Sequence, residues 1–222
     1  MKKLKIVAIS DTHNRHGKLV IPECDILIHA GDWTGRGFHN EIKPFAKWLD
    51  KQDQCKEIVV VPGNHELEFE KNLPASLEWF KEECPWAHLL INQSVTIEGV
   101  KIYGSPITPF FCDWAWNKWP GEIKPYWDAI PDDTQILITH GPPLDILDKT
   151  TYASGEWRED RLGCPQLSNR IKELKDLDLH FFGHIHASQG QKHVDGVSYY
   201  NCCICDETYS PTQPITIVDY EY

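Results

Sequence analysis

The sequence contains no apolar run that approaches the length of a membrane-spanning helix. Its first residues, MKKLKIVAIS, begin with basic side chains, but the apolar run covers only Ile6 to Ile9 and is soon followed by Asp11. A secretory signal peptide needs a longer apolar stretch and a cleavage site of small residues. We therefore expect a cytoplasmic protein that does not associate with membranes.

The eight cysteines supply no pair of matched C-x-x-C motifs, which a zinc finger would need. They are scattered apart from Cys202, Cys203 and Cys205 in the stretch NCCICD. No other cysteines stand at a spacing that would complete a soft-metal site with this cluster. We interpret the cysteines as reduced thiols, most of them buried as small hydrophobic side chains.

The sequence also has no surplus of basic residues. It contains 22 Lys and Arg residues and 33 Asp and Glu residues, which gives a formal net charge of −11. This balance argues against a long duplex nucleic acid as partner. It permits a small phosphoester substrate, because bound metal ions reverse the local sign of the charge. The 222 residues show no repeat, low-complexity tract or linker, so we expect one domain over residues 1–222.

Five short apolar runs end abruptly in polar residues. They have many β-branched residues and little polar alternation, which is typical of strands buried on both faces of a sheet. The runs cover residues 4–10, 25–31, 57–63, 135–139 and 178–182.

Amphipathic segments between these runs predict helices over 40–52, 76–83 and 164–177. Residues 95–105 have the pattern of a hairpin, and 196–204 and 214–220 have the pattern of further strands. The fold class is therefore α/β, with a sheet-based core and helices outside it. In such folds the functional side chains lie on loops at strand ends.

Two histidines, His184 and His186, follow the apolar run LHFF directly in the stretch GHIH. Residues two apart on an extended backbone point to the same side, so both imidazoles can reach one spot. A lone H-x-H is more often a pair of surface imidazoles, but other predicted strands end in similar chemistry. The matching side chains there are Asp11, His13, Asp32, Asn64, His65 and His140.

Carboxylate, amide and imidazole donors together favour Mn, Fe, Zn or Ni over Ca. Eight such groups exceed the ligands that one tetrahedral ion needs. We therefore expect this set to hold two divalent ions that share a bridging carboxylate.

The motifs DTH, GD, GNHE, HGPP and GHIH, in this order and each after an apolar run, resemble those of the calcineurin-like metallophosphoesterase superfamily. Longer stretches such as THGPPLDILD and FFGHIHASQG are similar to the subgroup of brain-type metallophosphoesterase-domain-containing phosphodiesterases. The resemblance implies a four-layer α/β/β/α sandwich with a mixed β core and a metal site on strand-end loops.

The resemblance also implies a role for each candidate residue. One metal ion is held by Asp11, His13 and His186, and the other by Asn64, His140 and His184. Asp32 bridges the two ions, and His65 lies beside the phosphate without binding metal. Manganese is the expected ion, and iron, zinc, nickel or cobalt also suit the set. A hydroxide shared by the ions attacks phosphorus, and His65 stabilises the charge or protonates the leaving oxygen.

We therefore expect a metal-dependent phosphodiesterase that acts on small or cyclic-nucleotide phosphodiesters. Two alternatives stay open. The same site would serve a nuclease or a phosphomonoesterase, and a metal-holding protein-interaction module would use the aromatic residues without catalysis. An exposed aromatic patch would also favour a homodimer.

Several further residues have two interpretations. Glu66 either orients His65 or serves as an acid in the first turn of a helix. His29 is interpreted as a core histidine rather than as part of the site. The aromatic stretch 110–127 is expected to be mostly packed, with one or two rings facing substrate. Residues 151–164 are expected to form a mobile loop from which Arg158 or Arg161 reaches a phosphate.

Overall fold

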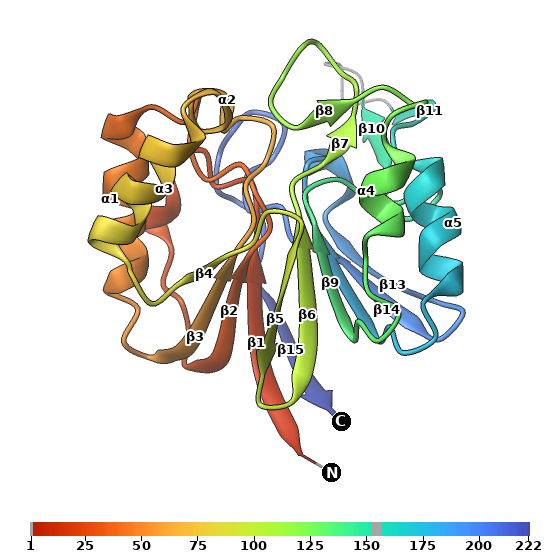
Figure 1. The fold of residues 1–222 in the computed structure, drawn as a ribbon, viewed down its shortest axis with the longest axis horizontal. Helices are drawn as coiled ribbons and strands as arrows, with labels where there is room; N and C mark the ends of the chain where they lie inside the picture. The colour runs from red at the N-terminus through yellow and green to blue at the C-terminus, as the bar shows by residue number, and fades with distance from the viewer. Residues whose placement is uncertain (1, 152–156) are drawn as a thin grey trace.

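Two β-sheets lie face to face at the centre of the molecule, and helices cover the outer face of each sheet (Figure 1). The structure, a computed structural model, describes residues 2–151 and 157–222. The arrangement confirms the predicted α/β/β/α sandwich. No helix of these two ranges has the length and apolar character that crossing a membrane would require.

The first sheet has the strand order β15-β1-β2-β3-β4. Strands β1 to β4 are parallel, and β15 pairs with β1 in the antiparallel sense. Their bounds are Lys3–Ile9 for β1, Cys24–His29 for β2, Cys55–Val60 for β3, His88–Leu89 for β4 and Thr216–Glu221 for β15.

The second sheet has the strand order β13-β14-β12-β9-β6-β5. Its four central strands are parallel, and both edge strands are antiparallel to their neighbours, so both sheets are mixed as predicted. The bounds are Gln93–Ile97 for β5, Val100–Ser105 for β6, Ile136–Thr139 for β9, Leu179–Phe182 for β12, Gly190–Val194 for β13 and Val197–Asn201 for β14.

The helices form the two outer layers (Figure 1). The first sheet is covered by α1 (His39–Asp50), α2 (Leu67–Lys71) and α3 (Leu73–Glu83), and the second by α4 (Lys124–Asp128) and α5 (Pro165–Glu173). Two short strand pairs lie outside the main sheets. They are β7 (Thr108–Pro109) with β8 (Asn117–Lys118), and β10 (Lys149–Thr151) with β11 (Trp157–Arg161).

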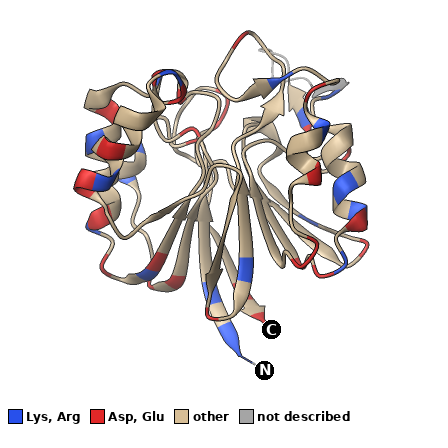
Figure 2. Ribbon diagram, viewed as in Figure 1, with Lys and Arg blue, Asp and Glu red and all other residues tan. Residues whose placement is uncertain are grey.

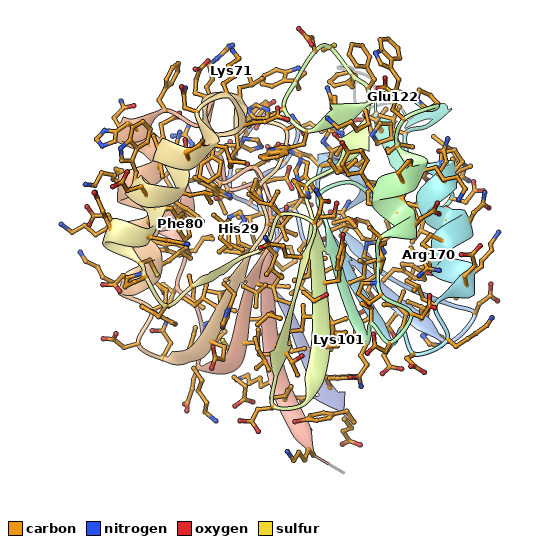
Figure 3. All side chains as sticks on the ribbon, viewed as in Figure 1. His29, Lys71, Phe80, Lys101, Glu122 and Arg170 are labelled. Carbon is orange, nitrogen blue, oxygen red and sulfur yellow. The ribbon has the colours of Figure 1, made fainter. Side chains whose placement is uncertain are left out.

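Alternate residues of the central strands face different neighbours, and both are apolar. In β1, Ile6 and Ala8 belong to the core between the sheets, whereas Val7 and Ile9 belong to the core under the helices. Phe80 of α3 is fully buried in that outer core (Figure 3). Charged side chains concentrate on the helices and at the lower strand ends (Figure 2). Burial on both faces explains the unbroken apolar runs in the sequence.

The structure differs from the sequence-based expectations in three places. The helix predicted to extend to residue 177 ends at Glu173, because Leu174 leaves the helical conformation and a turn over residues 175–176 follows. The predicted loop over 151–164 contains the end of β10 at Thr151 and all of β11, which pair as strands, and residues 152–156 lie outside the described residues. The short helices α2 and α4 were not predicted, since five residues carry too little periodicity.

The loops that follow the parallel strands of both sheets meet at the upper edge of the sandwich. Backbone hydrogen bonds join them: Asp11 N–H donates to Gly31 O at 2.9 Å, and Ile204 N–H donates to Ser10 O at 2.9 Å. Gly183 N–H donates to His140 O at 2.9 Å within the second sheet. This edge therefore collects the polar residues that end the strands.

Candidate metal centre

All eight candidate residues lie in one connected cluster at this edge. The loops after β1, β2 and β3 contribute those from the first sheet, and the loops after β9 and β12 contribute those from the second. Nitrogen, oxygen and sulfur donors gather within 4.8 Å of one another in three groups. These groups are Asp11, His186 and Cys203; His13, Asp32 and His65; and Asp32, His140 and His184.

Asp32 stands where the groups meet and is 2% exposed. Its Oδ1 lies 3.3 Å from Nε2 of His140. Its Oδ2 lies 4.0 Å from Nε2 of His13 and 3.9 Å from Nε2 of His65. The two oxygens of one carboxylate therefore face two different sets of imidazoles.

Asp11, His13 and His186 place three donor atoms around one point. Nε2 of His186 lies 3.2 Å from Oδ1 of Asp11 and 3.3 Å from Nε2 of His13. Nε2 of His13 lies 3.8 Å from Oδ1 of Asp11. Donors bonded to one divalent ion at roughly 2.1 Å stand about 3.0–3.4 Å apart. The two separations that involve His186 fall in this range, and the separation between His13 and Asp11 is longer.

Asn64, His140 and His184 form the other side of the cluster. Oδ1 of Asn64 lies 2.8 Å from Nε2 of His140, and the rings of His140 and His184 pack edge to face with centroids 5.0 Å apart. With Oδ1 of Asp32 these groups supply the mixed oxygen and nitrogen donors that suit Mn, Fe or Zn.

Backbone carbonyls fix the ring orientation of three histidines. Nδ1 of His140 lies 3.0 Å from Ala30 O, Nδ1 of His186 lies 2.9 Å from Asp206 O, and Nδ1 of His65 lies 2.8 Å from Gly35 O. Because a carbonyl only accepts, each Nδ1 carries the proton and each Nε2 is turned toward the cluster.

Charge within the cluster shifts several pKa values. Burial opposes protonation of His140, but the charge and hydrogen bond of Asp32 raise its pKa to about 9. Burial likewise opposes protonation of His186, and Asp11 raises its pKa to about 9. Burial lowers the pKa values of His13 and His184 to about 4. Binding of cations would therefore displace protons from His140 and His186.

Four of these residues adopt left-handed backbone conformations that non-glycine residues rarely occupy. The φ angles are 54° for Asp11, 41° for His13, 55° for Asp32 and 69° for His184. Each costs on the order of 1–3 kcal/mol and persists only where the surroundings fix it. Such strain concentrates at functional sites, because it points side chains where relaxed loops would not.

Glu66 braces the loops beneath the cluster. Its buried carboxylate accepts hydrogen bonds from the backbone N–H groups of Asp32 at 3.1 Å, Thr34 at 2.9 Å and Gly63 at 2.5 Å. Burial and the charge of Asp32 raise its pKa to about 8. The residue precedes α2, as the helix-acid interpretation requires, but its carboxylate ties the loop after β2 to the loop after β3.

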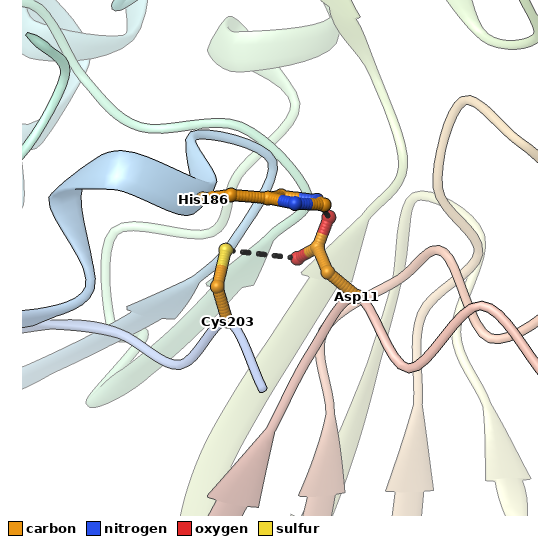
Figure 4. Close-up of side chains that lie close together, drawn as sticks. All are labelled: Asp11, His186 and Cys203. Carbon is orange, nitrogen blue, oxygen red and sulfur yellow. Dashed lines mark hydrogen bonds and ion pairs between the residues drawn. The ribbon is translucent and has the colours of Figure 1, made fainter. Parts of the chain in front are cut away.

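Three residues at the cluster were not predicted as site residues. The thiol of Cys203 lies 3.2 Å from Oδ2 of Asp11 (Figure 4). The ring of Tyr209 packs on His13 with centroids 4.7 Å apart, and Trp114 stacks on His65 at 4.5 Å. The NCCICD cluster contains Cys203 and the aromatic stretch contains Trp114, but neither pattern shows which thiol or ring turns inward, and Tyr209 lies outside both.

The structure also places other residues that had two interpretations in the sequence. His29 is fully buried at the end of β2 (Figure 3), which supports the core interpretation. Its Nε2 also lies 3.0 Å from the hydroxyl of Thr12, which stands between Asp11 and His13. In the aromatic stretch, Trp116 and Trp127 are buried in the core as expected. Arg161 pairs with carboxylates, and the side chain of Arg158 lies outside the described residues.

Comparison with known proteins identifies the family to which this chain belongs. The family model described as calcineurin-like phosphoesterase matches residues 4–188. The chain is 35% identical over 237 residues to metallophosphoesterase domain-containing protein 1 of Homo sapiens, covering 97% of this chain and 70% of the human protein. The chain belongs to the calcineurin-like phosphoesterase family. The resemblance predicted from the five motifs is thereby confirmed.

Membership of the calcineurin-like phosphoesterase family makes the protein a phosphoester hydrolase. The family generally uses a dinuclear site of divalent ions, and the cluster supplies suitable donor groups.

Solved structures share the fold at low identity. The protein TT1561 of Thermus thermophilus has a TM-score of 0.61 at 14% identity, covering 90% of this chain and 89% of that one. The phosphopantetheinyl hydrolase PptH from Mycobacterium tuberculosis has a TM-score of 0.58 at 17% identity, covering 92% of this chain and 90% of that one.

Proposed function

We propose that the protein is a phosphodiesterase that depends on two divalent metal ions and acts on small or cyclic-nucleotide phosphodiesters. The observation that carries this proposal is the position of Asp32. Its Oδ1 faces His140 at 3.3 Å, and its Oδ2 faces His13 and His65 at 4.0 and 3.9 Å. A carboxylate placed in this way is suited to bridge two ions.

In this proposal each ion has its own set of ligands besides Asp32. Asp11, His13 and His186 would hold one ion, and Asn64, His140 and His184 would hold the other. The inward Nε2 atoms of His140 and His186 support the assignment, as do the donor separations of 3.2 and 3.3 Å around His186. Mn²⁺ is the ion that we expect, with Fe, Zn, Ni and Co as alternatives.

When bound, such ions polarise phosphoryl oxygens and lower the pKa of water enough to supply a nucleophile at neutral pH. The chain contributes the placement of His65. Its Nδ1–H donates to Gly35 O at 2.8 Å, so Nε2 faces the cluster. From there a protonated Nε2 stabilises charge on the phosphoryl group or gives its proton to the leaving oxygen. Trp114 stacks on the ring and shields that face from water.

A phosphodiester carries one negative charge fewer than a monoester, which suits an acidic protein with a formal net charge of −11. A small phosphoester, such as a nucleotide, is therefore the expected substrate, and a long duplex nucleic acid is not expected. We also keep the sequence-based predictions that the protein is cytoplasmic and can form a homodimer.

The test is hydrolysis of bis(p-nitrophenyl) phosphate by purified protein with added Mn²⁺ and, separately, with a chelator. We expect metal-dependent turnover that Asp32→Ala and His140→Ala abolish while circular dichroism shows a folded chain. His193→Ala, which removes an exposed imidazole on β13, is the matched control and should keep full activity.

Full activity of Asp32→Ala would contradict the bridging role. A folded, Mn²⁺-loaded wild type that cleaves no phosphodiester would contradict the function. Parallel assays with 2′,3′-cyclic and 3′,5′-cyclic nucleotides, a short oligonucleotide and a monoester then identify the substrate class. Preference for the oligonucleotide or the monoester would favour the nuclease or phosphomonoesterase alternative.

A further inference from the structure

A cavity of about 530 Å³ opens directly beside the metal centre. His184, His186 and Tyr209 connect its lining to the cluster, and Phe110, Phe111 and Leu162 also line it. Its volume falls within the range of about 300–1,000 Å³ that is typical of small-molecule sites. A group attached to a phosphate at the metal centre would reach it without leaving the protein surface.

The rings of Phe110, Phe111 and Tyr209 line the cavity, and two of them are held in place. Phe110 stacks on Trp119 with centroids 3.7 Å apart and planes 12° apart. Tyr209 is fixed by edge contacts with His13 and His186, at 4.7 and 5.4 Å between centroids. Flat rings already fixed in the wall suit a planar ligand, because little side-chain freedom remains to be lost on binding.

Among the described residues no aromatic ring stacks on Phe111, which is 54% exposed. It follows β7 on the segment between β7 and β8, at the top of the molecule in Figure 1. An exposed phenylalanine on the wall of a cavity gains favourable free energy when a ligand removes its surface from water.

The charges of the wall argue against a second anionic group in the cavity. Nε of Arg161 lies 3.0 Å from a carboxylate oxygen of Asp145, and its Nη1 lies 3.0 Å from one of Asp148. The carboxylate of Glu207 also lines the cavity. The cationic Lys118 is thus balanced by an anion on the same wall, and the remaining surface is largely carbon.

We infer that this cavity is a subsite for an uncharged aromatic group, such as an aryl ring or a nucleobase, carried on an ester oxygen of the substrate. The inference rests on the proposed function and narrows it to diesters with a planar aromatic substituent. We expect Phe111 to contribute most to the preference for aromatic over non-aromatic substituents, because its exposed ring can be covered by the ligand.

Two monoanionic diester analogues test this subsite without turnover. Methyl benzylphosphonate, in which a methylene group takes the place of the ester oxygen that carries the ring, and methyl methylphosphonate share one charged head group and differ only in the phenyl ring. Their affinities for Mn²⁺-loaded protein are measured by titration calorimetry. We expect the phenyl analogue to bind about tenfold more tightly to wild type, as burial of one ring predicts. Phe111→Ala should reduce this ratio to about threefold or less.

Phe38→Ala is the matched control, because Phe38 is 47% exposed but does not line the cavity. It should keep the wild-type ratio. Equal affinities in wild type, an unchanged ratio in Phe111→Ala, or no binding of either analogue would overturn the subsite. A preserved phenyl preference in a protein that hydrolyses no diester would support the subsite and contradict the proposed function alone.

Discussion

The thiol of Cys203 lies 3.2 Å from Oδ2 of Asp11, on the side of the carboxylate that also accepts the backbone N–H of His184 at 2.9 Å (Figure 4). Burial, followed by the charge of Asp11, raises the pKa of this thiol well above its ordinary value. The thiol is therefore protonated and donates its hydrogen to Asp11. Both donors hold Oδ2 away from the cluster, which leaves Oδ1 facing His186 at 3.2 Å.

Cys203→Ala is expected to lower the affinity for Mn²⁺ by about 10- to 100-fold, which is the usual cost of losing a partner that orients a metal ligand. Cys203→Ser should keep most of the affinity, because its hydroxyl also donates. Calorimetric titration of the metal-free protein with Mn²⁺ measures both. Cys202→Ala is the control, because Cys202 is equally buried but belongs to the core between the sheets. An unchanged affinity in Cys203→Ala would refute the orienting role.

At pH 9, above the pKa of about 8, Glu66 is ionised, and Glu66→Gln should destabilise the protein by about 1–3 kcal/mol. The amide group offers fewer acceptor sites than the carboxylate to the backbone N–H groups of Asp32, Thr34 and Gly63. Turnover should fall with it, since the loop that holds Asp32 loses its brace. Urea unfolding and the diester assay measure the two effects. Glu68→Gln, which removes a charge from a surface pair with Lys71, should change neither. Equal stability of the two variants would rule out the bracing role.

Gly63→Ala is expected to abolish metal binding while the sandwich still folds. A Cβ atom at this position would collide with Oδ1 of Asp32 and would lie 2.7 Å from Cε1 of His140. Both side chains would have to move from the positions that face each other now. Mn²⁺ titration of Gly63→Ala, compared with Gly17→Ala, measures this effect, because a Cβ at Gly17 meets nothing within 4 Å. Normal binding by Gly63→Ala would show that the centre tolerates displacement.

Acid should destabilise the protein through His16, which packs between Phe45 and Trp48 and is 8% exposed. Burial lowers its pKa from 6.5 to about 4. Between these two values the unfolded chain binds a proton that the folded chain does not, so the free energy of unfolding falls as pH falls. The contribution lost is about 2 kcal/mol by pH 5, and it is fully present above about pH 6.5.

His16→Phe keeps an aromatic ring at this position and removes the titration. Urea unfolding at pH 7 and pH 5 should show a smaller loss of stability for His16→Phe than for wild type. Identical losses in both proteins would mean that His16 is protonated in the fold or does not control the acid limb.

Local sequence patterns were sufficient to predict the central strands of the two sheets and the set of polar residues that ends them. The runs around Ile6 and Ile136 are apolar at every position because both faces are buried, and that pattern is local. The motif order was sufficient for the family resemblance, which the match over residues 4–188 confirmed. Asp11, Asp32 and His140 were identified as candidates because each directly follows such a run.

Which groups meet, and how they are held, depends on tertiary packing alone. Cys203 approaches Asp11 from 192 positions away, and no local pattern distinguishes its thiol from that of Cys202. Trp114 and Phe111 lie three residues apart, yet one covers His65 and the other lines a cavity. The direction of a loop side chain depends on long-range packing and strained φ angles, because periodicity carries no information outside helices and strands.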